Sequence, residues 1–217
     1  MTLQLYAHPF SSYCQKALIA FYENDIPFEM RLLDGGEAST ELAALWSLKK
    51  FPVLVDGEHT VLEASIIVEH LGLYHPGPVQ LIPQDPRAAL EVRMMDRVFD
   101  NYVGTPQQAV VANALRAPED RDPVGVAAAR STLETAYAWL DKRMADREWA
   151  VGDSFSLADC AAAPHLFYAD WTHRIDPAFK NVHAYRGRLL ARPSFARAVD
   201  EARQYRSFFP LGAPDRD

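Results

Sequence analysis

The sequence predicts two domains of different fold class, an α/β domain followed by an all-helical domain. Two observations lead to this division. Strand-like and helix-like hydrophobic patterns alternate up to about residue 72, whereas the pattern after residue 86 has only the helical period. The intervening segment 72–86 contains two glycines and four prolines, which is typical of a linker. We therefore expect domains at residues 1–78 and 86–217.

The first elements follow from short hydrophobic patterns. Polar and apolar residues alternate over 2–6, as in a half-buried strand, and a second strand is expected over 28–33. Between them, residues 12–23 carry apolar side chains at spacings of three and four, the period of an amphipathic helix.

A hairpin and a closing helix complete the first domain. Residues 53–55 and 59–62 have the composition of two strands, and Asp56-Gly57 suits the positive backbone angles of a tight turn. A helix over about 64–71 follows. A strand–helix–strand unit joined to a hairpin and a final helix is the order of a thioredoxin-like domain.

Apolar stripes at helical spacing predict the helices of the second domain. Their members are Leu90, Met94 and Val98; Leu133, Ala136, Tyr137, Leu140 and Met144; Val182, Tyr185 and Leu189; and Phe195, Val199 and Ala202. The proline in Gly104-Thr105-Pro106 is expected to kink or end the first helix. Ser156 and Asp159 have the spacing of a capping box, which predicts a helix start.

Composition and charge exclude several kinds of function. Hydrophobic residues make up 49% and charged residues 24% of the chain, an ordinary globular composition. The net charge of -7 argues against a nucleic-acid-binding protein, which needs a basic surface. The sequence has neither the roughly 20-residue apolar run of a membrane span nor a signal-peptide pattern. We therefore expect a cytoplasmic protein with no membrane partner, in which Cys14 and Cys160 are free thiols.

Three segments of the first domain place polar groups beside a helix start or a proline. Ser11 is the expected N-cap of the first helix, whose N-terminus also favours an anion. Pro52 enters a strand from a loop, and a cis bond there would leave the backbone of Phe51 facing a ligand. Glu63 precedes the next helix, so its carboxylate can receive an ammonium group while the helix amides receive a carboxylate. Each segment alone is more typical of an ordinary cap or turn than of a ligand site.

In this order and spacing, the segments resemble the cytosolic glutathione transferases. Tyr-x-x-Pro-x-Ser-x-x-Cys-x-Lys (6–16), Lys-Phe-Pro-Val-Leu (50–54) and Leu-Glu-Ala-Ser-Ile-Ile-Val-Glu-His-Leu (62–71) are similar to motifs of the N-terminal domain of that family. Leu-Ile-Pro-x-Asp-Pro (81–86) and Gly-Asp-x-x-Ser-x-Ala-Asp (152–159) are similar to its interdomain segment and its C-terminal capping motif. The resemblance covers roughly residues 3–205 and suggests a serine-type, theta-, zeta- or tau-like bacterial member with the family's fold.

The resemblance implies a role for each matching residue near the first helix and the proline. Ser11 matches the serine that activates the thiol of glutathione, and Lys50 matches a position near the glycine carboxylate. The backbone of Phe51, before a cis Pro52, would pair with the cysteinyl backbone of glutathione.

The γ-glutamyl end of glutathione is expected at the next helix. Glu63 matches the acid that holds its ammonium group. The family usually has a serine at the following position, whereas this chain has Ala64 and then Ser65. The amides of Ala64 and Ser65, helped by the Ser65 hydroxyl, would therefore hold the γ-glutamyl carboxylate.

A serine hydroxyl is sufficient to activate the thiol. Lowering the pKa of a free thiol from about 8.5 to about 6.5 requires about 2.7 kcal/mol. A hydrogen bond to a charged acceptor contributes about 1.5–3 kcal/mol, and a helix N-terminus about 0.3–1 kcal/mol. Tyr6, which aligns with the tyrosine of the tyrosine-type classes, is the main rival of Ser11, followed by Ser12 and Cys14. We expect Cys14 to be inert because it shares the apolar face of the helix.

The predicted function is that of a glutathione S-transferase with glutathione as co-substrate and an electrophilic, largely apolar second substrate. His8, Tyr102 and Trp171 are expected to line the second-substrate pocket. The histidines and acids lack metal-ligand spacing, so no metal is predicted. The resemblance implies a homodimer. Two further functions stay open: a zeta-like glutathione-dependent isomerase or dehalogenase, suggested by the Ser11-Ser12 pair, and a non-catalytic binding or regulatory protein on the same scaffold.

Overall fold

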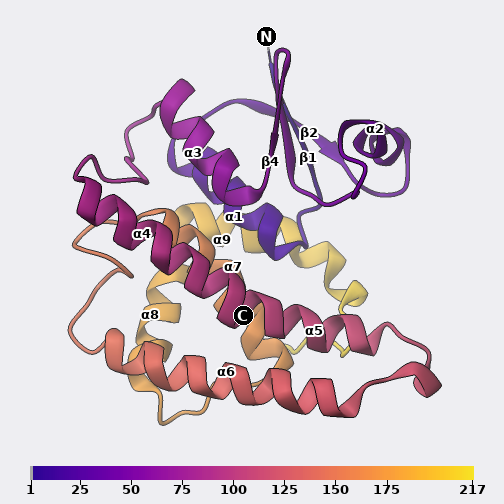
Figure 1. Cartoon of the computed structure of the whole chain (residues 1–217), viewed down its shortest axis with the longest axis vertical. Helices are drawn as coiled ribbons and strands as arrows, with labels where there is room; N and C mark the ends of the chain where they lie inside the picture. The colour runs from indigo at the N-terminus through magenta and orange to yellow at the C-terminus, as the bar shows by residue number, and fades with distance from the viewer. Residues whose placement is uncertain (1) are drawn as a thin grey trace.

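The computed structural model describes residues 2–217, which form an α/β domain packed on a helical domain (Figure 1). The α/β domain contains β1 (Leu3–Ala7), α1 (Ser12–Glu23), β2 (Phe28–Leu32), α2 (Glu37–Leu45), β3 (Val53–Asp56), β4 (His59–Leu62) and α3 (Ala64–Tyr74). The helical domain contains α4 (Pro86–Val98), the π-helical segment η1 (Phe99–Gly104), α5 (Thr105–Ala114), the 3-10 turn η2 (Pro118–Asp120), α6 (Pro123–Arg143), α7 (Leu157–Thr172), α8 (Lys180–Ala191), α9 (Pro193–Ala202) and the 3-10 segment η3 (Arg203–Phe208). The predicted fold class is confirmed. Within residues 2–217, every helix is too short or too polar to span a bilayer.

The sheet has the strand order β2-β1-β3-β4 and separates two apolar layers. β1 pairs in parallel with β2 and antiparallel with β3, so that Leu5 lies between Met30 and Leu54. Because side chains alternate along a strand, Leu5 belongs to the large core shared with α1 and α3, whereas Tyr6 packs with α2 on the opposite face.

The hairpin turn lies one residue later than predicted. Asp56 still belongs to the ladder, where it pairs with His59, and Gly57-Glu58 forms the two-residue turn. Gly57 has a φ of 60°, a left-handed conformation that glycine adopts without steric cost.

Helix α2 was not predicted from the sequence. It has nine residues, of which only Ala38 and Leu42 are buried. Two inward residues define too short a stripe for a helical period to stand out.

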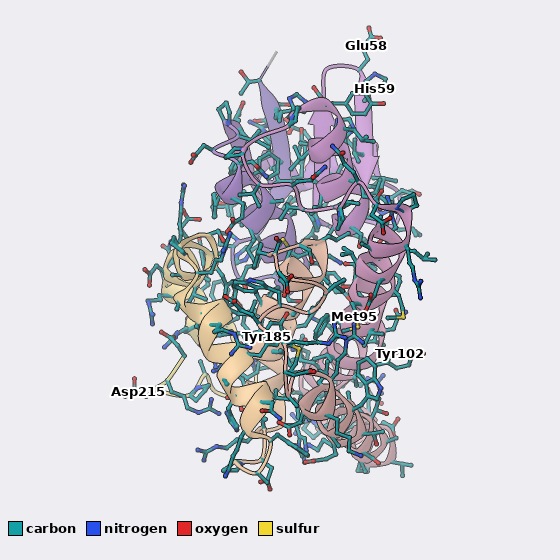
Figure 2. The ribbon with its side chains drawn as sticks, turned by 90° about the vertical axis from the view of Figure 1, so that its left-hand side faces the viewer. Glu58, His59, Met95, Tyr102, Tyr185 and Asp215 are labelled. Atoms are coloured by element: carbon teal, nitrogen blue, oxygen red, sulfur yellow. The ribbon has the colours of Figure 1, made fainter. Side chains whose placement is uncertain are left out.

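Helix α1 connects the two domains. It packs against α3 in its own domain and against α7 and α9 in the helical domain. One apolar cluster therefore extends from the sheet into the helical layer, and Figure 2 shows Tyr185 inside it. The first turn of α1 consequently has a fixed position at the boundary between the two domains.

The predicted stripe on α4 faces outward. Leu90 and Met94 are exposed, whereas Val92, Met95 and Phe99 are buried. Apolar residues recur on two faces of this helix, and spacing alone does not tell which face meets the core. The other three stripes are buried or half-buried, as predicted.

The segment around Gly104 changes the helical hydrogen-bond pattern without ending the helix. Residues 99–104 are π-helical and continue directly into α5. A Cβ at Gly104 would lie 2.7 Å from Cε1 of His165, so a glycine is required for α7 to approach this closely. The predicted kink at residues 104–106 is therefore a π-helical turn.

The predicted cap at the start of α7 is present. The Asp159 carboxylate accepts hydrogen bonds from the amide and the hydroxyl of Ser156, each at 2.9 Å. It also accepts from the Ala150 amide at 2.9 Å and from the Tyr185 hydroxyl at 2.6 Å. These bonds stabilise a buried carboxylate and tie α7 to α8.

Candidate active site

Ser11 is the N-cap of α1 and is half-buried. Its backbone is extended, and its Oγ accepts a long hydrogen bond of 3.4 Å from the Cys14 amide. A hydroxyl that accepts a bond still has its own hydrogen to donate. Ser11 therefore presents a hydrogen-bond donor at a helix N-terminus, where an anion is favoured.

A cleft of about 290 Å³ opens in front of Ser11. Its walls come from the loop after β1, the start of α1, the residue before Pro52, α5, α7 and the C-terminal tail. The polar and aromatic residues that line it are His8, Phe10, Ser11, Ser12, Phe51, Gln107, Gln108, Tyr168, Phe208 and Phe209. The fold thus combines a serine hydroxyl with a largely aromatic wall.

The peptide bond between Phe51 and Pro52 is cis, as expected. Phe51 is exposed and borders the cleft, while Pro52 is buried at the start of β3. Lys50 precedes them on the same exposed loop. The loop therefore presents backbone groups and a positive charge at the same edge of the sheet.

Glu63 has an unusual backbone conformation at the start of α3. Its φ is 69° and its ψ is 124°. A non-glycine residue with a positive φ costs about 1–3 kcal/mol and is concentrated at functional sites. Glu63 is exposed, and none of the described side chains caps this end of α3. A carboxylate and the open first-turn amides of a helix are therefore adjacent.

Ser65 differs from its expected role. It is buried, and its hydroxyl accepts a hydrogen bond from Lys16 Nζ at 2.8 Å and donates one to Asp96 Oδ2 at 2.8 Å. Arg97 also donates to it. Because the hydroxyl is engaged inside the protein, only the Ser65 amide is left to contact a ligand.

The hydroxyl of Ser65 belongs to a charged cluster that the sequence did not predict. Lys16 is 0% exposed and forms ion pairs with Asp96 at 2.5 Å and Asp100 at 2.9 Å. His165 bonds to Asp100 at 2.9 Å. Burial alone would raise the pKa of Asp100, but the hydrogen bond from His165 and the charge of Lys16 outweigh it and lower that pKa. The cluster joins α1, α3, α4, η1 and α7.

Tyr6 lies on the opposite face of the sheet from the large core. Its hydroxyl donates to Glu41 Oε2 at 2.8 Å, and Tyr6 packs with residues of α2. Burial and the hydrogen bond to Glu41 raise the pKa of Tyr6. Its hydroxyl is thus engaged with α2, and Tyr6 does not border the cleft.

Ser12 and Cys14 differ in their access to the cleft. Ser12 borders it, is 2% exposed, and its Oγ has no hydrogen-bond partner among residues 2–217. Cys14 is fully buried, and burial raises the pKa of its thiol to about 12. Cys14 therefore belongs to the core, as predicted. Ser12 is the other hydroxyl in the cleft that could activate a thiol, so its role has to be compared with that of Ser11.

Both cysteine thiols are expected to be unreactive in the folded chain. With a pKa of about 12, only about one Cys14 thiol in ten thousand is ionised at pH 8, and Cys160 is also buried. A chromogenic disulfide reagent at pH 8 should label neither thiol in native protein during the time in which it labels both in urea. Rapid native labelling that disappears in Cys14→Ala would contradict the core assignment.

Comparison with known proteins identifies the family. Models of the glutathione S-transferase N-terminal and C-terminal domains match residues 5–79 and 123–188. Glutathione S-transferase theta-1 of Homo sapiens is 30% identical over 183 residues, which cover 77% of this chain and 73% of the relative. The chain belongs to the glutathione S-transferase family.

Two further proteins show the range of the similarity. A crystal structure of a glutathione S-transferase from Methylobacterium radiotolerans in complex with glutathione sulfonate has a TM-score of 0.80 and 30% identity, and the match covers 92% of this chain and 95% of that one. A Stringent starvation protein A homolog of Coxiella burnetii is 25% identical over 203 residues, 92% of each chain. The resemblance predicted from the sequence is confirmed at the level of the family.

Of the residues predicted to line a second-substrate pocket, only His8 borders the cleft. Trp171 is buried behind it, packed on Phe10 and Phe209 at ring distances of 6.4 and 5.3 Å. The prediction for Tyr102 was wrong: this residue is 57% exposed and lines a different groove of about 470 Å³ with Trp139. Figure 2 shows it on the outer side of the helical domain.

Of the aromatic residues that line the cleft in their place, Tyr168 was considered from the sequence but assigned to the core, and Phe10 and Phe209 were not predicted. Phe10 adjoins Ser11 in the sequence, and that proximity could have identified it. Tyr168 and Phe209 are distant in sequence, and only the packing of α7 and the C-terminal tail brings them to the cleft.

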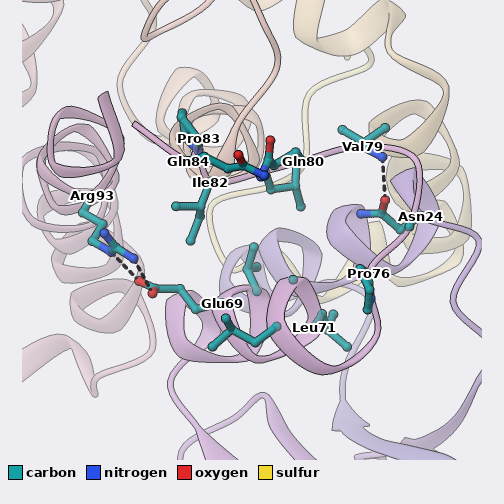
Figure 3. Close-up of a pocket in the computed structure, with 15 residues that line it drawn as sticks. Asn24, Glu69, Leu71, Pro76, Val79, Gln80, Ile82, Pro83, Gln84 and Arg93 are labelled. Carbon is teal, nitrogen blue, oxygen red and sulfur yellow. Dashed lines mark hydrogen bonds and ion pairs between the residues drawn. The ribbon is translucent and has the colours of Figure 1, made fainter. Parts of the chain in front are cut away.

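A larger hollow of about 460 Å³ lies between α3 and the linker (Figure 3). Asn24 Oδ1 accepts from the Val79 amide at 2.8 Å, and Arg93 pairs with Glu69 at 2.8 Å on the opposite wall. The Asn24 contact holds the linker against the first domain, and the Arg93–Glu69 pair joins α4 to α3. Ser11 does not line this hollow.

Proposed function

We propose that this member of the glutathione S-transferase family is a transferase that binds reduced glutathione at the edge formed by β3 and α3 and ionises its thiol beside Ser11. The observation that carries the proposal is the position of the Ser11 hydroxyl: it lies at the N-terminus of α1, it has a hydrogen to donate, and it shares its cleft with Phe51. The thiol proton leaves to solvent, and the thiolate attacks an electrophilic carbon of the second substrate. A sulfur–carbon bond forms as the bond from that carbon to a leaving group breaks, and the leaving group departs to solvent with the electron pair.

The remaining groups would hold the two ends of glutathione. Glu63 receives the γ-glutamyl ammonium, and the amides of Ala64 and Ser65 receive the neighbouring carboxylate. Lys50 lies near the glycine carboxylate, and the backbone of Phe51, before Pro52, pairs with the cysteinyl unit. The complex of the Methylobacterium radiotolerans relative with glutathione sulfonate supports this choice of ligand.

The second substrate is a largely apolar electrophile. Phe10, Tyr168, Phe208 and Phe209 supply an aromatic wall next to Ser11, and apolar walls with few polar groups are typical of small-molecule pockets. Gln107 adds one buried polar group, because its Oε1 has no hydrogen-bond partner within residues 2–217. A role in detoxification in the cytoplasm fits this specificity.

Replacing Glu63 by glutamine is expected to weaken glutathione binding by about 10–100-fold, because the ion pair with the ammonium group is lost. Glutamine keeps the Cβ, so the strained φ of 69° is unchanged. Turnover at saturating glutathione should fall much less than affinity. Calorimetric titration with glutathione measures the first effect, and a conjugation assay the second.

Two controls separate this contact from a general effect of charge. Glu58→Gln removes an exposed carboxylate at the hairpin tip and should leave affinity unchanged. A glutathione analogue without the amino group should bind wild type and Glu63→Gln about equally. Equal loss of affinity for both ligands would refute the ammonium contact.

A homodimer is part of the proposal. Leu90, Met94 and Tyr102 form an exposed apolar line along α4 and η1, and exposed apolar surfaces of this kind mark protein contacts. Burial of this line against a second copy would account for its composition.

A non-catalytic binding or regulatory role is the second candidate. It is favoured by the similarity to the Stringent starvation protein A homolog of Coxiella burnetii, which extends over 92% of each chain. Glutathione at millimolar concentration should raise the unfolding temperature if the first proposal holds. Turnover should be tested with several electrophiles, including halogenated acids and maleylacetoacetate-like substrates. If glutathione neither stabilises the protein nor is turned over with any of them, the binding or regulatory role is favoured.

A further inference from the structure

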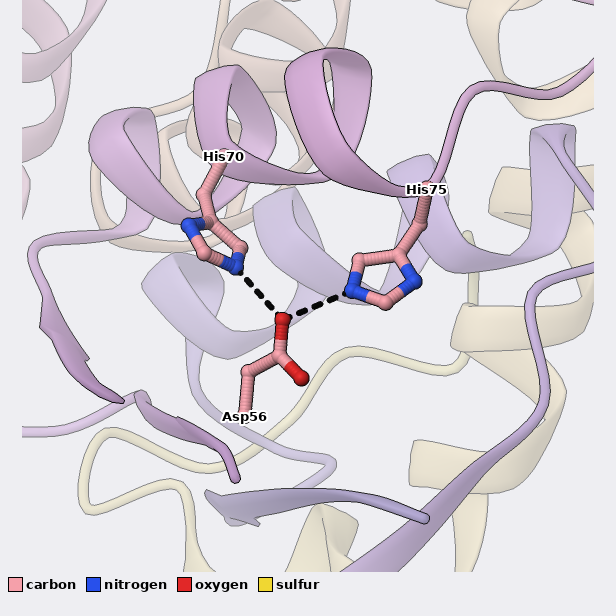
Figure 4. A group of neighbouring side chains, drawn as sticks. All are labelled: Asp56, His70 and His75. Atoms are coloured by element: carbon pink, nitrogen blue, oxygen red, sulfur yellow. Dashed lines mark hydrogen bonds and ion pairs between the residues drawn. The ribbon is translucent and has the colours of Figure 1, made fainter. Parts of the chain in front are cut away.

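Two histidines and one aspartate meet at the outer ends of β3 and α3 (Figure 4). Nε2 of His70 lies 2.9 Å from Asp56 Oδ2, and Nε2 of His75 lies 2.7 Å from the same oxygen. One ligand atom from each residue lies within 4.8 Å of those of the other two. Three potential ligands thus converge on one point.

We propose that Asp56, His70 and His75 bind a divalent transition-metal ion such as Zn²⁺. Imidazole nitrogen and carboxylate oxygen are common zinc ligands, at about 2.0–2.2 Å from the ion. In a tetrahedral site, such ligand atoms lie about 3.4 Å apart. The present nitrogen–oxygen distances of 2.7 and 2.9 Å therefore need to open by only about 0.5–0.7 Å, which small side-chain rotations supply.

The surroundings suit an ion with an open coordination position. All three side chains are half-buried, so water can reach the fourth position. The ring of Tyr74 packs 4.6 Å from that of His70 and covers one side of it. Three protein ligands with one solvent position are the arrangement of catalytic rather than structural zinc sites.

The sequence spacing concealed this site. His70 and His75 are five residues apart, which does not place them on one face of a continuous helix. Helix α3 ends at Tyr74, and His75 follows with a φ of −133° and a ψ of 53°. This change of direction turns the second ring toward Asp56, so the sequence-based prediction of no metal missed a site that tertiary structure assembles.

The site is separate from the proposed glutathione site. Ala64 begins α3 near Glu63, whereas His70 lies about 9 Å further along the helix axis. Asp56 is likewise at the opposite end of β3 from the cis Phe51-Pro52 bond. The metal proposal therefore stands whether or not glutathione is a substrate.

The test uses the untagged full-length chain, stripped with a chelator and titrated with Zn²⁺ in the absence of glutathione, which itself binds metals. We expect one Zn²⁺ per chain. His70→Gln and His75→Gln should each lower the affinity for Zn²⁺ at least about 100-fold, because even substitutions of residues that only hydrogen-bond to metal ligands lower metal affinity about 10–100-fold. His173→Gln removes another histidine paired with a carboxylate, Glu134, and should change the affinity less than about two-fold.

Two measurements on wild-type protein keep the test independent of variant folding. Co²⁺ should give a visible spectrum of nitrogen and oxygen ligands without a thiolate charge-transfer band, because both cysteines are buried. Zn²⁺ should protect His70 and His75 from acylation by diethyl pyrocarbonate. Four outcomes would each overturn the proposal and leave a metal-free hydrogen-bonded triad: no binding at one ion per chain, wild-type affinity in both His70→Gln and His75→Gln, a thiolate band in the Co²⁺ spectrum, or acylation of His70 and His75 that Zn²⁺ does not reduce.

Discussion

Replacing Ser11 by alanine is expected to lower kcat/KM at neutral pH by about 10–100-fold and to raise the pKa of bound glutathione thiol by about one to two units. The hydroxyl supplies a hydrogen bond to a charged acceptor, which is worth about 1.5–3 kcal/mol, and one pKa unit corresponds to about 1.4 kcal/mol. Because the defect lies in forming the thiolate, the rates of mutant and wild type should converge as the pH rises above the mutant's thiol pKa. Thiolate absorbance and the pH dependence of kcat/KM measure both effects, and glutathione affinity should change only a few-fold.

Ser11→Ala also removes the helix cap, and this loss of stability has to be distinguished from the loss of thiol activation. Ser11 caps α1, and a serine-to-alanine change at an N-cap costs about 1 kcal/mol of stability, whereas glycine costs only a few tenths. Ser11→Gly should therefore lose as much activity as Ser11→Ala while unfolding nearly as wild type does. Ser12→Ala is the matched control in the same cleft and should retain activity. A large defect in Ser12→Ala with none in Ser11→Ala would move the role to Ser12.

Replacing Lys16 by methionine is expected to destabilise the folded chain by about 3–5 kcal/mol. Lys16 is fully buried between Asp96 and Asp100. Its removal leaves two buried carboxylates that share Arg97 and His165 as their remaining partners, and the loss of one partner from a buried ion-pair network is strongly destabilising. Denaturation by urea, followed by circular dichroism, measures the change. Since the same cluster engages Ser65 at the start of α3, glutathione affinity should also fall in the variant.

The surface pair of Arg93 and Glu69 provides the control. It has similar geometry, at 2.8 Å, but the Arg93 side chain is exposed, so Arg93→Gln should cost less than about 1 kcal/mol. At acid pH, the free energies of unfolding of Lys16→Met and wild type should also differ less. The pKa of Asp100 is lowered in the folded chain, so its contribution is complete above its ordinary pKa of 3.8 and is lost as the pH falls further. Equal destabilisation by both variants would contradict the importance of burial.

Local rules were sufficient for most of the helices and strands and for the cap at Ser11. Helix α1 begins at Ser12 as predicted because Ser11 caps it and apolar residues recur at spacings of three and four. The cis bond before Pro52 and the acid at Glu63 were predicted by family resemblance, and the physics of an X–Pro bond or a helix cap would not have distinguished them from ordinary turns. Helix α2 was not predicted because its two buried residues are too few to show a helical period.

The wrong predictions share one physical cause. The spacing of apolar residues identifies a face of a helix, but it does not tell which other element packs against that face. Leu90 and Met94 have a helical period, yet the neighbouring face of α4 meets the core. Tyr102 was assigned to the cleft, but η1 directs it to the opposite groove. Ser65 carries a hydroxyl at the expected position, but packing of α1 against α3 brings Lys16 and Asp96 to it first.

The sequence by itself determined the two-domain fold class and the family, because the order of patterns and motifs along the chain specifies both. It also determined the start of α1 at Ser12, after the cap at Ser11, and the helical cap at Asp159, because each depends on residues close together in the chain. Tertiary structure alone decided that Tyr6 pairs with Glu41 instead of facing the cleft, that Tyr168 and Phe209 complete its wall, and that Lys16 is buried among carboxylates. It also decided the meeting of Asp56, His70 and His75. These outcomes depend on which surfaces of distant elements come into contact. The spacing of residues within one segment does not determine which side chains are buried or paired between such surfaces.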